Sequence, residues 1–265
     1  MKDKLLIILL IAGIAVLTIW EWTSSDTKNF LWNETLDSDN FSPQGQAILE
    51  HSRTQLVPNQ GIEGSTALRV DYEGYERGSH RVVVSPPISP AAQYELSYWV
   101  RFCDGFDFAR GGKLHGVGPT APVGGGNPIT PEGWSARLMF RGDGGLQTYV
   151  YHQDMSGKYG DTAIAPNFTF QPGQYQHVVM QVMLNAPAEE ANGLIKVWVD
   201  DELLIEHQGL RFRDRLTPES EIQRLMFNTF HGGSSPEWAP RMADGSYKTD
   251  CAFFDNIALT STFER

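Results

Sequence analysis

The sequence predicts an all-β fold, a concanavalin-like β-jelly-roll sandwich that forms a single domain after an N-terminal hydrophobic segment. Short segments rich in aromatic and β-branched residues recur along the chain, turn residues separate them, and helical periodicity is almost absent. With 265 residues, of which 41% are hydrophobic, the chain is long enough to bury the core of one large domain. Among antiparallel sandwiches we expect a jelly roll.

Residues 1–24 have the composition of a signal sequence or membrane anchor. Lys2 and Lys4 precede an apolar run from Leu5 to Trp20, and this layout directs the N-terminus inside and the rest of the chain outside. The run is slightly shorter than the roughly 17 to 25 residues of a spanning helix, but no small-x-small cleavage motif follows it. We therefore expect an uncleaved anchor, with a cleaved signal as the alternative.

Both alternatives predict export, either to the periplasmic face of the inner membrane or into the medium. Residues 25–40 are interpreted as a linker and residues 41–265 as the jelly-roll domain, which we expect to be monomeric.

The domain is expected to fold into short strands joined by turns. The candidate strands are 67–73, 80–85, 94–102, 177–184, 194–207 (a hairpin about Asp200-Asp201), 222–230 and 251–259. Residues 134–152 form a further β-hairpin. The Gly- and Pro-rich segment 116–133 is too long for a tight turn, and loops of this length inside a compact domain are often functional.

Charge and cysteine content limit the partners and the redox setting. The net charge of −11 disfavours nucleic acid as a partner, because no concentrated basic surface is evident, but an anionic substrate remains compatible if cations gather locally. Export permits Cys103 and Cys251 to pair, but the sequence does not show their separation, so a disulfide and two buried thiols both stay open.

The hairpin at 134–152 carries two pairs of polar residues. Ser135 and Arg137 share one strand face, and Tyr149 and Tyr151 share another, because side chains alternate along a strand. A three-residue loop at 142–144 sets Arg137 against Tyr149 and joins the two pairs, whereas a two-residue turn separates them. Local chemistry leaves both registers open.

Glycines flank Lys113 in "GGKLHG" and allow a ligand or a neighbouring backbone to approach closely. This segment, followed by "SARLMF" and "YVY", resembles polysaccharide lyase family 14, the alginate and glucuronan lyases with a β-jelly-roll fold. The resemblance spans roughly residues 65–260 and includes "YWVRF", "VDDELL" and "FHGGSSPEWAP". His115 departs from it, because many relatives have proline there.

The resemblance implies that Lys113, Ser135, Arg137, Tyr149 and Tyr151 lie in the active groove, and hence that the two hairpin pairs share its face. It implies a polysaccharide lyase that cleaves a polyuronate, either alginate (polymannuronate) or glucuronan, by β-elimination and leaves unsaturated uronate ends.

β-Elimination gives these residue types a chemical use. A cation, Lys113 or Arg137, would stabilise the charge that develops on the substrate carboxylate when the C5 proton leaves. Tyr149 or Tyr151 would act as base and acid, since two nearby cations favour the phenolate. Ser135 would hydrogen-bond the substrate, because no activating base or G-x-S-x-G motif accompanies it.

Several further residues are candidates for contacts with the sugar or its carboxylate, each with a structural role as the alternative. They are Asn127, His115, His152, His231 and Trp238. No metal-ligand spacing is present, so we expect no cofactor, although a structural calcium ion is compatible with such sandwiches.

Three other functions are compatible with such a sandwich but fit the residues of this sequence less well. A glycoside hydrolase needs paired carboxylates, and no E-x-D-x-E pattern occurs. A non-catalytic carbohydrate-binding protein at the cell surface would not need the tyrosines together with Lys113 and Arg137. A purely structural envelope protein is the third. The sequence therefore favours an exported lyase whose partner is an acidic polysaccharide.

Overall fold

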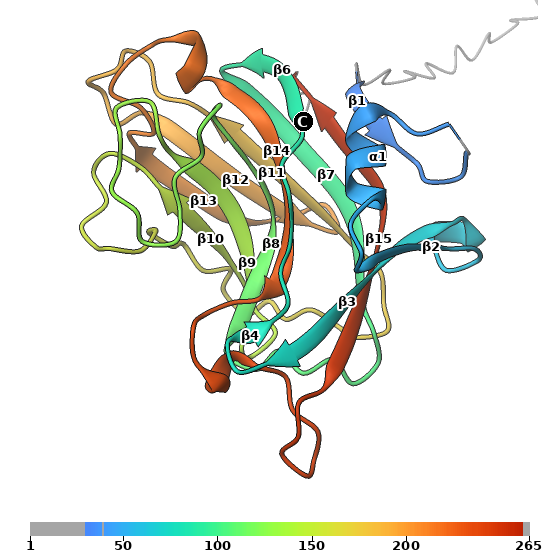
Figure 1. Cartoon of the computed structure of the whole chain (residues 1–265). Helices are drawn as coiled ribbons and strands as arrows, with labels where there is room; N and C mark the ends of the chain where they lie inside the picture. Colours follow the sequence, from blue (N-terminus) through green and yellow to red (C-terminus); the bar gives the residue numbers. More distant parts are fainter. Residues whose placement is uncertain (1–29, 39, 262–265) are drawn as a thin grey trace, which may run out of the picture.

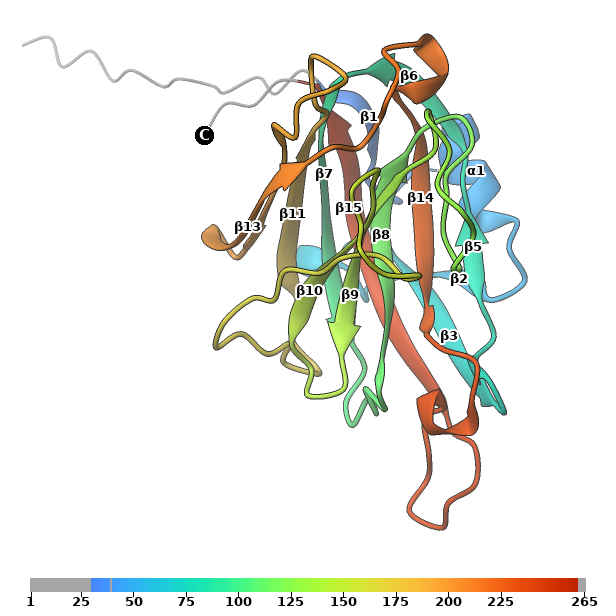
Figure 2. The same cartoon turned by 90° about the vertical axis from the view of Figure 1, so that its left-hand side faces the viewer.

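The computed structural model describes residues 30–38 and 40–261, in which two antiparallel sheets lie face to face (Figures 1 and 2). The larger sheet has the order β13 (Glu202–Leu210), β12 (Gly193–Val199), β11 (Gln176–Met183), β7 (Gln93–Phe102), β15 (Thr249–Thr260), β3 (Ala67–Tyr75) and β2 (Thr54–Val57), with β1 (Phe30–Glu34) beside β15 and β4 (Gly78–Ser79) beside β3. The smaller sheet has the order β10 (Leu146–Tyr151), β9 (Ser135–Arg141), β8 (Gly111–Gly118), β14 (Ile222–His231) and β5 (Val82–Val84), with β6 (Pro87–Ala91) beside β14. Helical structure comprises α1 (Pro43–Leu49) and the 3₁₀ turns Ile62–Gly64, Pro218–Ser220 and Pro236–Trp238.

The predicted all-β sandwich is confirmed, and the predicted strands lie within one to three residues of the observed ones. The hairpin about Asp200 and Asp201 is present, and both residues have positive φ, as tight hairpin turns require. Strand β8 was not predicted, because its glycines are typical of a turn. A side chain at Gly112 or Gly116 would overlap the neighbouring strands, so these glycines let β8 pack between β9 and β14.

The first strand of the larger sheet, β1, lies before residue 41, the predicted start of the domain. Strand β1 pairs with β15, and Trp32 in β1 is buried and donates to the Ser42 hydroxyl at 2.7 Å. The interpretation of residues 25–40 as a linker is therefore wrong for 30–34, because their pairing with the last strand is a long-range contact that local composition does not reveal. The expected anchor, residues 1–24, lies outside the described residues. Among those that are described, no helix has the length and hydropathy to cross a membrane.

Aromatic side chains fill the space between the sheets. Phe102, Phe106 and Phe140 meet edge to face or tilted, with ring centroids 4.6 to 5.7 Å apart, and Tyr72 joins them. Such pairs contribute about 0.5–1.5 kcal/mol each beyond the area they bury. The core thus holds the inner face of the smaller sheet, and the outer face of β8, β9 and β10 is left for polar residues.

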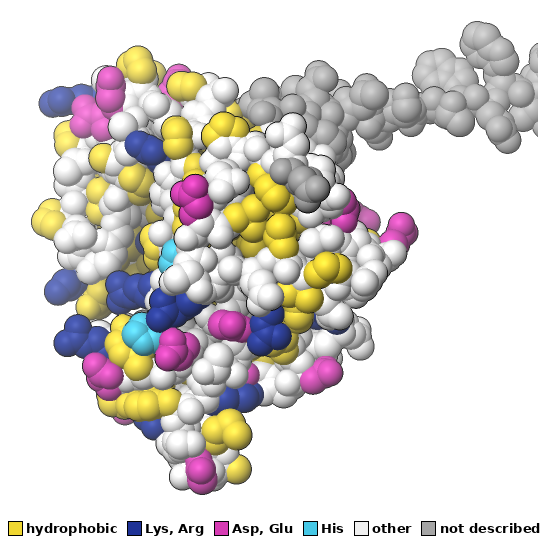
Figure 3. Space-filling view, turned by 45° about the vertical axis from the view of Figure 1, so that its right-hand side comes forward, with side chains coloured by type: hydrophobic (Ala, Val, Ile, Leu, Met, Phe, Trp, Pro, Cys, Tyr) yellow, Lys and Arg dark blue, Asp and Glu magenta, His cyan; other side chains and the backbone are white. Residues whose placement is uncertain are grey.

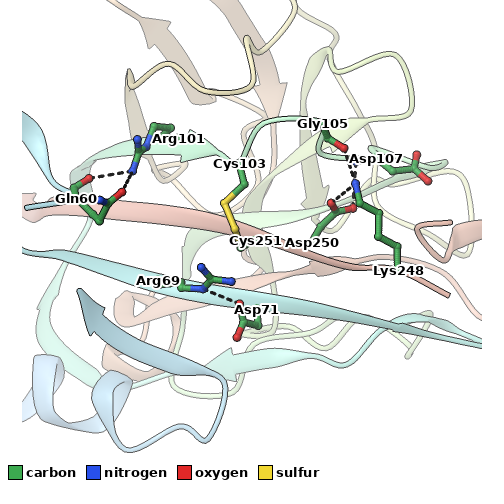
Figure 4. The surroundings of a disulfide bond; sticks show 10 residues. All are labelled: Gln60, Arg69, Asp71, Arg101, Cys103, Gly105, Asp107, Lys248, Asp250 and Cys251. Atoms are coloured by element: carbon green, nitrogen blue, oxygen red, sulfur yellow. Dashed lines mark hydrogen bonds and ion pairs between the residues drawn. A yellow bond between two sulfur atoms is a disulfide. The ribbon is translucent and has the colours of Figure 1, made fainter. Parts of the chain in front are cut away.

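Cys103 and Cys251 form a disulfide that links the end of β7 to β15 (Figure 4). Their Cα atoms are 5.4 Å apart, and the Cys103 amide donates to the Cys251 carbonyl at 2.9 Å. Of the two alternatives that the sequence left open, the paired form is the one present. The bond closes a loop between residues 148 positions apart.

Reduction of this disulfide should lower the free energy of unfolding by about 2–5 kcal/mol, because closure of a long loop restricts the unfolded chain. Denaturant unfolding with and without a reductant measures the difference, with the Cys103→Ser/Cys251→Ser variant as the control that should not respond to reductant. Equal stability in both conditions, or two free thiols in non-reducing mass mapping, would contradict the prediction.

Candidate active site

The β9–β10 hairpin has the register that unites its polar residues. Tyr149 lies opposite Arg137 and Tyr151 opposite Ser135. The Arg141 amide donates to the Gly145 carbonyl at 2.8 Å, which leaves residues 142–144 as a three-residue loop. Gly144 has a φ of 77°, the left-handed conformation that such a loop requires at its last position. The loop geometry therefore decides between the two registers.

Four side chains meet on the outer face of the smaller sheet. The Lys113 Nζ lies 3.5 Å from the centroid of the Tyr149 ring, and the Arg137 guanidinium carbon lies 5.4 Å from the same centroid. The hydroxyls of Tyr149 and Tyr151 are 3.3 Å apart. We call Lys113, Arg137, Tyr149 and Tyr151 the outer-face cluster. It gathers two basic side chains and two phenols on one face of the sheet.

A β-bulge in β8 removes His115 from this face. Lys113 pairs with Met139 and Gly116 with Arg137, so Leu114 and His115 together face the single residue between those partners. Both side chains turn into the core, and the His115 ring stacks on Phe227 with centroids 4.0 Å apart. The prediction that His115 binds substrate is wrong, because the extra residue reverses the face that simple alternation would give.

His231 and His152 are also buried. The Nε2 atom of His231 lies 2.7 Å from the Asp107 carbonyl oxygen, and its ring stacks on Phe106. The Nε2 atom of His152 lies 2.9 Å from an Asp161 carboxylate oxygen. Neither imidazole reaches the outer-face cluster, and the predicted substrate contact of His231 is therefore wrong. These histidines hold neighbouring segments to the sheet.

The buried histidines should make the protein labile to mild acid. Burial lowers the pKa of His115 to about 3 and that of His231 to about 4, whereas both titrate near 6.5 in an unfolded chain. Since the unfolded state then binds more protons, stability is complete above about pH 6.5 and falls as the pH drops toward 4. The expected loss is about 2 kcal/mol per histidine between pH 7 and pH 5.

Denaturant unfolding of the wild type and of His115→Phe at these two pH values tests the effect. Phenylalanine suits a site lined by aromatic rings and does not titrate, so the variant should lose about 2 kcal/mol less than the wild type on acidification. An equal loss in both proteins would contradict the assignment.

Ser135 holds a loop in place and has no exposed surface. Its hydroxyl donates to the Val123 carbonyl at 2.6 Å and accepts a bond of 3.4 Å from Arg137 Nη2. The predicted direct contact with substrate is therefore wrong. The hydroxyl instead orients the guanidinium and ties the segment between β8 and β9 to the sheet.

That segment, the Gly- and Pro-rich loop, lies against the outer-face cluster. The Gly126 amide donates to the Tyr151 hydroxyl at 2.8 Å, and Tyr151 has no exposed surface. Asn127 is exposed, and its side-chain amide donates to the Gly124 carbonyl at 2.7 Å. The loop thus positions Tyr151, and Asn127 shapes the loop.

Trp238 is half-buried in the turn after β14. Its ring packs on Gly233, which has a φ of 97°, and the Arg110 guanidinium carbon lies 5.8 Å from its centroid. Among the described residues, the aromatic and cation contacts of the Trp238 ring do not include Tyr149, Tyr151 or Arg137. The structure thus shows Trp238 anchoring its loop.

In the outer-face cluster, burial shifts the pKa values of Tyr149 and Lys113 more than the neighbouring charges do. It raises the pKa of the Tyr149 phenol, and the adjacent Tyr151 adds to the effect, while Arg137 only partly opposes it. The expectation that two cations favour a phenolate is therefore wrong for Tyr149. Burial, together with Arg137 and Arg81, holds the pKa of Lys113 well below its usual value.

Sequence reasoning missed several residues that lie beside the cluster. Met139 Sδ lies 2.9 Å from Lys113 Nζ, and the alternation of Ser135, Arg137 and Met139 along one strand could have indicated it. Arg81 and the segment 158–160 come from distant parts of the chain, and no local pattern connects them with Lys113. Among the residues that the structure describes, no group of three or more His, Cys, Asp or Glu side chains could hold a metal ion.

Comparison with known proteins agrees with the fold and identifies the family. The family model for polysaccharide lyase 14 matches residues 72–251. No curated protein matches the sequence.

Three solved structures illustrate the similarity of the fold. The marine PL-14 alginate lyase from Aplysia kurodai is 22% identical with a TM-score of 0.67, over 88% of this chain and 99% of that one. Alginate lyase vAL-1 from Chlorella virus is 19% identical with a TM-score of 0.62, over 79% of this chain and 89% of that one. The endo-β-1,4-glucuronan lyase from the fungus Trichoderma reesei is 15% identical with a TM-score of 0.54, over 81% of this chain and 89% of that one. Because the family model covers well over half of the sequence, the chain belongs to polysaccharide lyase family 14.

Proposed function

We propose that this polysaccharide lyase cleaves a polyuronate by β-elimination, with mannuronate-rich alginate and glucuronan as the leading substrates. The observation that carries the proposal is the outer-face cluster, in which Lys113 lies 3.5 Å from the Tyr149 ring and Arg137 faces the same ring. The printed names of the similar structures, alginate lyases and a glucuronan lyase, support the substrate class. Family 14 lyases are cofactor-independent, so the side chains supply the chemistry.

Arg137 is the group best suited to hold the substrate carboxylate. Its guanidinium stays charged even though burial lowers its pKa, and it has donors for both carboxylate oxygens. Loss of the C5 proton spreads a second negative charge onto this carboxylate. A fixed cation in a partly dry groove stabilises that charge more than it stabilises the ground state.

Lys113 is the proposed base. Its depressed pKa favours the neutral amine over the ammonium relative to an ordinary lysine, and a neutral amine can accept the C5 proton. The electrons of the C5–H bond form the C4–C5 double bond, and the C4–O4 bond breaks. This assignment replaces a tyrosine phenolate, since Tyr149 keeps its proton.

Tyr149 is the proposed acid, and its phenol protonates the departing O4. Tyr151 acts through Tyr149. The Gly126 N–H donates to the Tyr151 oxygen, so the Tyr151 hydroxyl can donate its own proton to the Tyr149 oxygen. The Tyr149 proton is then available to the substrate. Transfer of a proton from the Lys113 ammonium to the Tyr149 phenolate then restores both groups.

A polyuronate panel tests the function. The purified protein would be incubated with polymannuronate, polyguluronate, glucuronan and an uncharged polysaccharide, while the ultraviolet absorbance of unsaturated uronate ends is followed and binding is measured separately. We expect absorbance to rise with at least one polyuronate and not with the uncharged polymer. Binding without unsaturated ends at any pH would favour a non-catalytic carbohydrate-binding protein instead.

We further propose that the enzyme is exported and held at the membrane by its N-terminal segment. The charged start, the apolar run and the disulfide, which persists in oxidising compartments, support this location. Membrane fractionation with N-terminal sequencing tests it, and a soluble mature protein that begins after Trp22 would rule out the anchor.

A further inference from the structure

Eight of the 17 Lys and Arg side chains of the described residues form an ion pair with a described Asp or Glu. Figure 3 shows this mixture on one face, where Lys and Arg side chains lie next to Asp and Glu. The ion pairs include Arg53–Glu73, Arg69–Asp71, Arg141–Asp143, Lys196–Glu206 and Arg215–Glu132. The other nine form no ion pair with any described residue, and four of these nine, Arg81, Lys113, Arg137 and Lys158, lie in or beside the outer-face cluster. Since Lys113 is the proposed neutral base, the unpaired cations here are Arg81, Arg137 and Lys158. In a chain with a net charge of −11, their gathering around one cluster indicates an anionic ligand.

Arg81 lies on one side of the cluster. It precedes β5, is exposed, and its guanidinium carbon is 5.3 Å from the centroid of Phe230. Phe230 is opposite Lys113 in the β14–β8 ladder, and Lys113 is opposite Met139 in β9. Residues opposed in this way share a face of the sheet, so Arg81 lies beside the outer face on the β5 side of Lys113. Its charge is close enough to lower the Lys113 pKa.

Lys158 and Tyr159 lie on the other side, beyond the edge strand β10. A Cβ atom at Gly126 would be 2.9 Å from the Lys158 Cε and 3.2 Å from the Tyr159 ring, and Gly126 itself bonds to Tyr151. Lys158 is exposed and Tyr159 is 59% exposed. An exposed cation and an exposed aromatic ring thus lie beside Gly126, the residue that donates to Tyr151.

We propose that Arg81 and Lys158 bind the carboxylates of uronate residues on either side of the residue that reacts, and that Tyr159 packs against a sugar ring. The polymer then crosses the strands of the smaller sheet, from β5 past β10. Because adjacent strands lie about 4.8 Å apart, Arg81 beside β5, Arg137 in β9 and Lys158 beyond β10 are spread along this path. This inference rests on the proposed function, because it requires a polyuronate as the substrate.

Steady-state kinetics of Arg81→Gln, Lys158→Gln and the double variant test the proposal on polyuronate and on a series of oligouronates. Each single substitution should raise KM about 2- to 5-fold and leave kcat unchanged, the range for an exposed ion pair. The double variant should also show a weaker dependence of KM on salt, because two screened contacts are gone. The rise in KM and the weaker salt dependence should both vanish on the shortest oligouronates that are cleaved. Lys158→Arg, which keeps the charge, should have the wild-type KM.

Arg69→Gln and Lys196→Gln are matched controls. Arg69 also lies over an aromatic ring, 5.9 Å from the centroid of Phe253, and Lys196 is a partly exposed lysine, but both belong to the larger sheet. Neither substitution should change KM. If the wild type cleaves no polyuronate, the proposed function fails. If the wild type cleaves a polyuronate but the double variant keeps the wild-type KM and salt dependence, the inference about Arg81 and Lys158 is wrong. It is also wrong if the double variant loses kcat while KM is unchanged.

Discussion

Replacing Lys113 with methionine should reduce kcat for polyuronate cleavage by at least about 100-fold, the lower end of what a general base contributes. Methionine keeps the length and the apolar stem, and Lys113 already lies beside Met139 and over the Tyr149 ring, so the fold should be retained. Initial rates from absorbance of the unsaturated product measure the loss. Lys196→Met is the control and should keep the wild-type rate.

The variant Lys113→Arg tests whether Lys113 acts as the base or only supplies a positive charge. Arginine keeps the positive charge but does not give up its proton, so the variant should be about as inactive as Lys113→Met if Lys113 takes the C5 proton. Substantial activity in Lys113→Arg would show that only the charge matters and would return the role of base to a tyrosine.

The pH dependence of kcat is a second, independent test of Lys113 as the base. Since the Lys113 pKa is lowered, wild-type kcat should rise with pH and level off below the ordinary lysine pKa of about 10.4. A rate that keeps rising beyond that value would instead report ionisation of the Tyr149 phenol, whose pKa is raised by burial.

Tyr149→Phe should also lower kcat by at least about 100-fold, with a much smaller change in KM, because the phenol acts mainly while the C4–O4 bond breaks. The ring that Lys113 lies over is retained, so the cation should stay in place. Kinetics on the best substrate of the panel, together with binding to the same polymer, measure the two effects.

Tyr151→Phe is the informative comparison. Tyr151 is fully buried and bonded to Gly126 and Tyr149, so its removal should cost less than loss of Tyr149. Equal losses in the two variants would contradict the division into acid and positioning residue. Full activity in Tyr149→Phe would exclude Tyr149 as the acid.

The sequence by itself determined the fold class and most of the outer-face cluster. The alternation in 134–152 selects Ser135 with Arg137 and Tyr149 with Tyr151, because the period of a strand is two wherever the strand is regular. The glycines around Lys113 correctly indicated a close approach of backbone. In this case the neighbouring strands, which pack against β8, occupy the space.

Only the tertiary structure decided which of these side chains lie on the outer face of the smaller sheet. The positive φ of Gly144 sets the hairpin register, the bulge in β8 turns His115 into the core, and the Val123 carbonyl takes the Ser135 hydroxyl. Arg81 and Lys158 reach the site from segments far apart in the chain. Register, bulges, burial and the resulting pKa shifts depend on contacts between distant segments, and local sequence does not contain those contacts.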